Sequence, residues 1–75
     1  MKTGQRFKTA RLARALTVPE LAALAGIGST TVWRIEQGIV EPRVVTARRI
    51  GEILGVDPGY LLLGDESAVK RTRTA

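Results

Sequence analysis

Two glycines interrupt the most apolar part of the chain, the stretch LAALAGIGSTTVWRIEQG at residues 21–38. Glycine readily adopts the left-handed conformation that ends a helix, so Gly26 predicts the end of a helix that begins upstream. In the polar run after the glycines, Val32 and Ile35 stand three residues apart, which places both on one face of a new helix. The sequence therefore predicts two short helices joined by a tight turn. The outward face of the second helix would carry Ser29, Thr30, Trp33 and Arg34.

Capping residues mark other helix boundaries. TVPE at residues 17–20 places a glutamate three positions after a threonine, with a proline in the first turn, which is the pattern of a capping box. Asp57 and Pro58 repeat this start signal near the C-terminal end. Five helices are predicted, over residues 4–15, 18–25, 29–37, 44–54 and 58–63. The residues between the third and fourth helices have no helical period, and no segment has the pattern of a strand.

The apolar faces of these helices predict one small core. In a chain of 75 residues, folding hides only about 60% of the surface of the unfolded chain, so a single domain is expected. We assign this domain to residues 1–66 and expect residues 67–75 to form a basic, disordered tail. The second helix is expected to bury Leu21, Ala22, Leu24 and Ala25. The spacing of Val44, Ala47, Ile50, Gly51 and Leu54 marks the fourth helix, which Gly55 ends.

The composition argues against an enzyme and for a polyanionic partner. The chain has no cysteine and no histidine, which removes disulfides, the common metal sites and the usual general base, so no cofactor and no metal site are expected. No apolar run is long enough to span a bilayer, and a cytoplasmic protein without a membrane partner is expected. Twelve lysines and arginines against seven acids give a net charge of +5, which favours binding to a polyanion such as DNA.

These features together resemble a known family. RFKTARLARALTVPELAALAGIGSTTVWRIEQG followed by EPRVVTARRIGEILGVDP, within residues 4–64, is similar to the Cro/repressor-like (XRE) helix-turn-helix proteins. The resemblance implies an all-α fold, the five-helix lambda-repressor-like domain, whose third helix enters the major groove of double-stranded DNA. It also implies a sequence-specific transcriptional regulator, most simply a phage or bacterial repressor. An antitoxin or another protein-interaction module on the same fold is the alternative.

The resemblance assigns roles to individual residues. Ser29, Thr30 and Arg34 match positions that contact base edges, and Trp33 either packs on thymine methyl groups or lies over neighbouring helix surface. Contacts to the DNA backbone are expected from Thr17, Val18, Arg43 and Lys8. Arg11 and Glu36 match a pair that forms a structural salt bridge. Tyr60, Leu61 and Leu62 either cap the end of the core or, as the resemblance suggests, form the interface of a homodimer, which would require an inverted-repeat operator.

Some positions leave an alternative open. Gly28 stands where relatives carry a capping serine or threonine, so Ser29 could cap the third helix instead of contacting DNA. Val18 replaces a polar residue that helps to fix the register on DNA in relatives. Arg6 and Arg14, like Lys8, could form an ordinary solvated face of the first helix.

Overall fold

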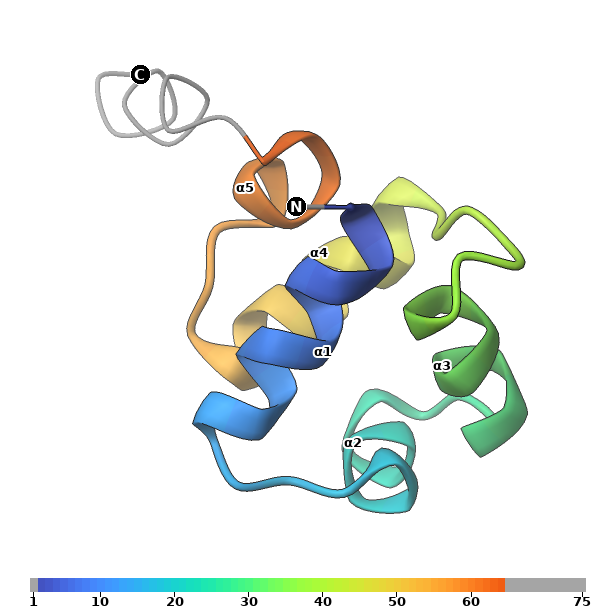
Figure 1. The fold of residues 1–75 in the computed structure, drawn as a ribbon. Coiled ribbons are helices and arrows are strands. Elements are labelled where there is room, and N and C mark those ends of the chain that lie inside the picture. The colour runs from blue at the N-terminus through green and yellow to red at the C-terminus, as the bar shows by residue number, and fades with distance from the viewer. Residues whose placement is uncertain (1, 65–75) are drawn as a thin grey trace.

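The computed structural model describes residues 2–64, and these form five helices and no strand. The helices are α1 (Thr3–Ala13), α2 (Val18–Ala25), α3 (Ser29–Glu36), α4 (Val44–Leu54) and α5 (Pro58–Leu63) (Figure 1). The predicted all-α, five-helix fold is confirmed. The predicted boundary at residue 66 and the basic tail lie outside the described residues.

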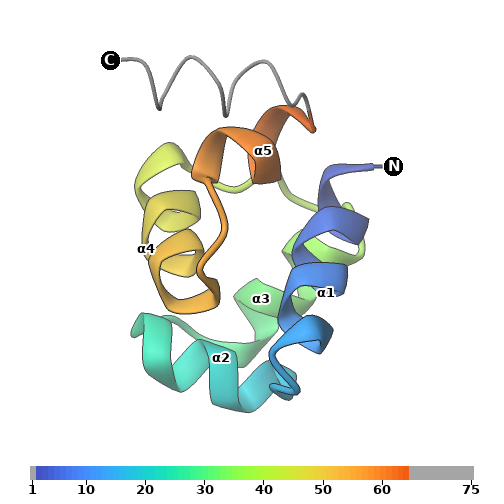
Figure 2. The ribbon, with the colours of Figure 1, turned by 90° about the vertical axis from the view of Figure 1, so that its left-hand side faces the viewer.

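The five helices enclose one core. α1 and α4 lie on two sides of it, α5 closes one end and α2 the other, and α3 packs against α1 and α2 (Figure 2). The core consists of Phe7, Leu21, Ala22, Ala25, Val32, Ile35, Ala47, Ile50, Leu54 and Leu61. Every helix contributes to this set, so the position of α3 depends on the packing of the whole domain.

The helix boundaries follow local signals, with one correction. α1 ends at Ala13, two residues earlier than predicted, and Ala15 adopts a left-handed conformation with φ 56°. The amide of Ala15 bonds back to the carbonyl of Leu12 at 2.9 Å, which closes a tight final turn. Gly26 ends α2 with φ 68°, as predicted. The chain therefore reaches α2 through a sharp turn and not through a longer first helix.

The N-terminus of α3 is capped by Gly28. This glycine has the extended backbone of an N-cap and no side chain to bond to the first-turn amides. Ser29 is the first residue of the helix itself. The alternative in which Ser29 caps α3 is therefore wrong, and its exposed hydroxyl is left to other partners.

Leu24 was predicted to be buried but is exposed, and so is Val44, which belongs to the apolar spacing of the fourth helix. Leu24 on α2 is 60% exposed and Val44 at the start of α4 is 56% exposed. Both satisfy the helical spacing, but Leu24 lies on the outer edge of α2, and α4 begins beyond the core. The apolar pattern locates a helix, whereas the width of its buried face depends on its neighbours.

Arg6 and Arg14, which were candidates for a solvated surface, instead bind the C-terminal ends of helices, and Arg49 does the same. Arg6 is buried, and its guanidinium donates to the carbonyls of Leu61 and Leu62 on α5, each at 3.0 Å. Arg14 Nε donates to the carbonyl of Leu54 on α4 at 3.1 Å. Arg49 Nη1 donates to the carbonyl of Ala25 on α2 at 3.2 Å. Helix C-termini have unpaired carbonyls and a partial negative charge, which a guanidinium neutralises.

The burial of Leu61 corrects the predicted dimer interface. Its side chain is fully buried in the core of its own chain, because α5 packs against both α1 and α4. A second copy cannot contact it, so the assignment of Leu61 to the interface is wrong. Tyr60 and Leu62 are half-buried, and Leu63 is the exposed leucine of α5.

Among residues 2–64, no helix is both long and apolar enough to cross a membrane.

Candidate nucleic-acid interface

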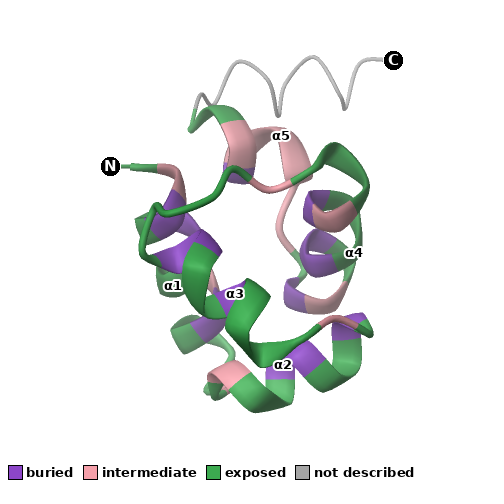
Figure 3. Cartoon of the chain, turned by 90° about the vertical axis from the view of Figure 1, so that its right-hand side faces the viewer, coloured by how far each residue is buried: buried purple, intermediate pink, exposed green. Residues whose placement is uncertain are grey.

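α3 presents a polar stripe on one side and core residues on the other. Val32 and Ile35 are buried, and the outer surface of the helix is exposed (Figure 3). The exposed residues include all four that were predicted to contact bases, namely Ser29, Thr30, Trp33 and Arg34. The indole of Trp33 is half-exposed, at 49%. This stripe has hydroxyl groups, an aromatic ring and a guanidinium but no acid, a combination that suits base edges in a major groove.

The turn before α3 fixes the angle between α2 and α3. Gly26 supplies the left-handed residue, and the amide of Ile27 donates to the carbonyl of Ala22 at 3.0 Å. Ile27 then packs its half-buried side chain against the core. Arg49 completes the turn from the side of α4 through its bond to Ala25. The turn is thus held by backbone conformation, by packing and by one hydrogen bond from outside the motif.

A buried ion pair ties α1 to the end of α3. Arg11 Nε donates to Glu36 Oε2 at 2.7 Å and Arg11 Nη2 donates to Glu36 Oε1 at 3.0 Å, the bidentate geometry in which a guanidinium matches a carboxylate. Both side chains are more than nine-tenths buried. The hydrogen bond to Glu36 raises the pKa of Arg11 above its ordinary value. The expected structural salt bridge is therefore present, and Arg11 Nη1 also binds the carbonyl of Leu16 at 2.7 Å.

The N-terminus of α2 is occupied by its own cap. Thr17 accepts a hydrogen bond from the amide of Glu20 at 3.2 Å, and the Glu20 carboxylate accepts one from the amide of Thr17 at 2.8 Å. These bonds lower the pKa of Glu20 below its ordinary value. Pro19 has no N–H group, and Val18 packs its half-buried side chain on the core. The start of α2 thus offers a phosphate few amide donors.

The exposed cations are distributed around α3. A hollow of about 310 Å³ brings Lys2 and Lys8 beside Gln37 and Gly38, just after the end of α3. Arg43 is exposed at the N-cap of α4. Sequence reasoning selected Lys8 and Arg43 but not Lys2, because no helical period connects the N-terminus of α1 with the end of α3. The close approach of Gly4 to the carbonyls of α3 is what places Lys2 there.

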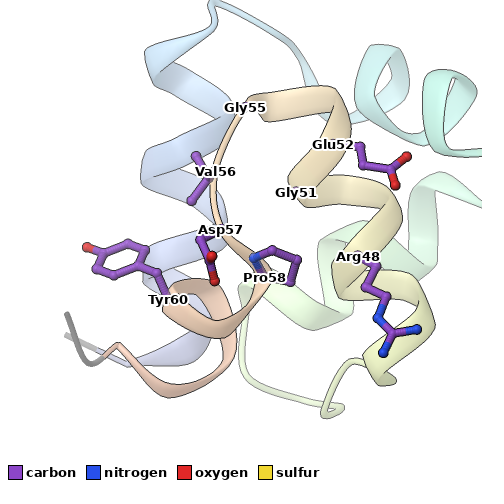
Figure 4. Close-up of a pocket in the computed structure, with 8 residues that line it drawn as sticks. All are labelled: Arg48, Gly51, Glu52, Gly55, Val56, Asp57, Pro58 and Tyr60. Atoms are coloured by element: carbon purple, nitrogen blue, oxygen red, sulfur yellow. The ribbon is translucent and has the colours of Figure 1, made fainter. Parts of the chain in front are cut away.

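A larger hollow, of about 550 Å³, lies on another part of the surface (Figure 4). It forms where α4 meets the segment leading into α5, because Gly51 has no side chain against the carbonyl of Val56. Arg48 and Tyr60 point away from one another in this view. The carboxylate of Asp57 accepts a bond from the amide of Gly59 at 2.7 Å and serves as the cap of α5. No residue of α2 or α3 lines this hollow, so it is separate from the exposed stripe.

Comparison with known proteins agrees with this geometry. The sequence model of the helix-turn-helix domain family matches residues 3–61. No curated protein matches the chain in sequence. The structure is similar to that of SinR, the master regulator for biofilm formation, in complex with DNA, with 27% identity, 81% of this chain and 98% of that chain covered, and a TM-score of 0.77.

Two further solved structures have the same arrangement of helices. The restriction-modification controller protein C.AhdI from Aeromonas hydrophila is 29% identical, with 79% of this chain and 89% of that chain covered and a TM-score of 0.74. The P22 c2 repressor in complex with a synthetic operator is 23% identical, with 87% of this chain and 98% of that chain covered and a TM-score of 0.81, a likeness of fold. The chain belongs to the helix-turn-helix domain family and has the fold of its Cro/repressor-like (XRE) members.

Proposed function

We propose that this chain is a sequence-specific, double-stranded DNA-binding transcriptional regulator that acts in the cytoplasm as a repressor of the phage or bacterial kind. Its third helix would enter the major groove, and occupancy of a promoter would block transcription without catalysis or a cofactor. The observation that carries the proposal is the exposed, acid-free stripe of α3 on a helix fixed by buried residues on its other side. The family and the DNA-bound structure of SinR support it.

Base recognition is assigned to the exposed stripe. A guanidinium can make a bidentate contact to guanine O6 and N7, and we assign this contact, which contributes about 1–3 kcal/mol of discrimination, to the exposed Arg34. Ser29 and Thr30, in the first turn of α3, can donate to or accept from either base edge. The half-exposed ring of Trp33 can pack on a thymine methyl group. All four residues belong to one helix, so a single insertion would bring them into the groove together.

Backbone contacts are assigned to the cations that the fold leaves exposed. Lys2 and Lys8 flank the end of α3, and Arg43 precedes α4. The guanidinium of Arg49 is bonded to the end of α2, and we therefore do not assign it a phosphate. Thr17 and Val18 remain the proposed contact of α2, through the amide of Val18. Each neutralised phosphate would add about 0.9 to the steepness of the fall in affinity with salt.

We further propose that the regulator binds its operator as a homodimer. Two copies related by a two-fold axis would present two third helices about 34 Å apart, one helical turn of DNA. The operator would then be an inverted repeat. Sequence symmetry in bound DNA is the direct consequence.

Selection of bound fragments from a random pool of duplex DNA tests the proposal. The expected result is a single consensus with inverted symmetry, bound much more tightly than unrelated duplexes and with an affinity that falls steeply with salt. Fragments without a shared sequence, or no binding at low salt, would contradict it. Capture of a protein partner with no DNA binding would instead favour the protein-interaction alternative.

A further inference from the structure

The one large apolar side chain that α3 exposes lies within its polar stripe. Trp33 is 49% exposed, whereas the other large apolar residues of this helix, Val32 and Ile35, are buried. Within residues 2–64, no group accepts a hydrogen bond from the indole N–H, so packing alone holds the ring. An indole in water lacks the free energy that burial of its surface would give. The stripe therefore includes a contact surface for an apolar group.

Thr30 is the neighbour of both Trp33 and Arg34 on the surface of α3. It precedes Trp33 by three residues and Arg34 by four, the two spacings at which side chains meet on a helix, and all three residues are exposed. The methyl group of Thr30 and the face of the indole thus form an apolar pair beside the guanidinium. Side chains three or four residues apart on a recognition helix reach successive base pairs. The apolar pair would then meet the base pair next to the one that Arg34 contacts.

The chemistry of the stripe favours one feature of a pyrimidine. In the major groove, a carboxylate recognises the amino group of cytosine, a carboxamide recognises adenine, and an apolar side chain recognises the C5-methyl group of thymine. The exposed part of α3 has neither a carboxylate nor a carboxamide, because its one acid, Glu36, is buried in the pair with Arg11. The feature that remains is the methyl group. 5-Methylcytosine has this group on the same ring atom as thymine and presents the same contact.

We infer that Thr30 and Trp33 bind the C5-methyl group of a pyrimidine in the base pair next to the guanine of Arg34, so that affinity depends on thymine or 5-methylcytosine at this position. The inference rests on the proposed function and adds a form of regulation to it. Where the operator has cytosine at this position, methylation of that cytosine raises the affinity. Loss of the methyl group changes no hydrogen-bonding group of the base pair, so the effect is that of one apolar contact, about fourfold in the binding constant.

Single substitutions of pyrimidines in the selected operator test the inference. Each thymine is replaced in turn by deoxyuridine, which lacks only the methyl group, and each cytosine by 5-methylcytosine, which gains it. For the wild type, we expect a position at which deoxyuridine weakens binding about fourfold, or 5-methylcytosine strengthens it about fourfold. Trp33→Ala should bind the two forms of that duplex equally. Leu24→Ala, at a similarly exposed apolar residue outside α3, is the matched control and should keep the full methyl effect.

Fluorescence gives a readout that does not depend on affinity, because Trp33 is the only tryptophan of the chain. Saturation with the operator should protect the indole from quenching by acrylamide. The inference is overturned if no pyrimidine responds to the gain or loss of its methyl group, if Trp33→Ala keeps the full response, if Leu24→Ala loses it, or if the operator leaves the quenching unchanged. In each of these cases the chain still binds its operator, and the proposed function stands. A chain that binds no duplex overturns both proposals, so the two failures are distinguishable.

Discussion

Gly4 of α1 lies directly against the backbone carbonyl of Glu36 at the end of α3. A Cβ atom on Gly4 would overlap the Glu36 carbonyl oxygen and would lie 2.6 Å from that of Ile35. No such contact is tolerated between real atoms, and the obstacle is backbone that cannot rotate away. The first helix and the proposed DNA-contacting helix are therefore in contact through main chain at this point, a few residues from the Arg11–Glu36 ion pair.

Replacement of Gly4 by alanine should destabilise the domain. Alanine is the better helix former, so propensity alone predicts a gain. The forced separation of α1 from α3 should instead lower the free energy of unfolding by about 1–3 kcal/mol. Urea denaturation followed by circular dichroism measures this difference. Thr9→Ala, at an exposed position of the same helix, is the control and should be neutral or slightly stabilising; equal stability of both variants would argue against the close crossing.

Loss of the Arg11 guanidinium should have a larger effect. Arg11→Met leaves the Glu36 carboxylate buried without its partner, which costs about 3–5 kcal/mol. A domain of this size has a total stability toward the lower part of the range of about 5–15 kcal/mol, so the variant should be partly unfolded near room temperature. Thermal unfolding measures the loss, with Lys8→Met on the same helix as the exposed control. If Arg11→Met lowers the unfolding temperature no more than Lys8→Met does, the ion pair between Arg11 and Glu36 contributes little to stability.

Features encoded by neighbouring residues could be predicted from the sequence. The capping box at Thr17, the left-handed Gly26 and the start of α5 at Asp57 each depend on residues within one helical turn, and the structure has all three. Features that depend on the contacts between helices could not. Leu24 and Leu61 have the same apolar character, yet one is exposed and the other is buried. The difference in burial arises because α5 packs on α1 and α4 and so covers Leu61.

The stability of α2 should depend on the charge of Glu20. Hydrogen bonds from Thr17 lower the pKa of this carboxylate in the folded state. A lowered pKa means that the ionised carboxylate stabilises the fold above its ordinary pKa of about 4.3, and that this contribution is lost as the pH falls through the folded value. Glu20→Gln keeps the cap without the charge. The excess stability of the wild type over Glu20→Gln should therefore shrink on acidification, and a difference independent of pH would contradict this.

Arg49 should contribute to the stability of the turn before α3, whereas its neighbour should not. Arg49→Met removes the hydrogen bond to the carbonyl of Ala25 and should cost about 0.5–1.5 kcal/mol. Arg48→Met changes the adjacent exposed arginine with the same loss of charge and is the matched control. Hydrogen exchange at the amide of Ile27, which bonds to Ala22, should become faster only in Arg49→Met. Equal exchange rates at the amide of Ile27 in both variants would mean that Arg49 does not stabilise the turn.

Only part of the candidate interface could be predicted from the sequence. The exposed stripe of α3 follows from the spacing of Val32 and Ile35, because one helix defines both of its own faces. The basic residues around it are a different matter. Lys2 approaches the end of α3 only through the Gly4 crossing, and Arg6 and Arg49 are withdrawn to helix ends by tertiary contacts. A count of cations in the sequence cannot tell the exposed cations near α3 from the arginines that bind helix ends.

The central claim is that the exposed stripe of α3 distinguishes one DNA sequence from another. Titration of Arg34→Ala and Lys8→Ala with the selected operator and with an unrelated duplex, at several salt concentrations, tests it most directly. The account predicts that Arg34→Ala loses about 1–3 kcal/mol on the operator and little on the unrelated duplex. Lys8→Ala should weaken both equally and reduce the salt slope by about 0.9. Equal losses on both duplexes for Arg34→Ala would contradict the assignment of base recognition to α3.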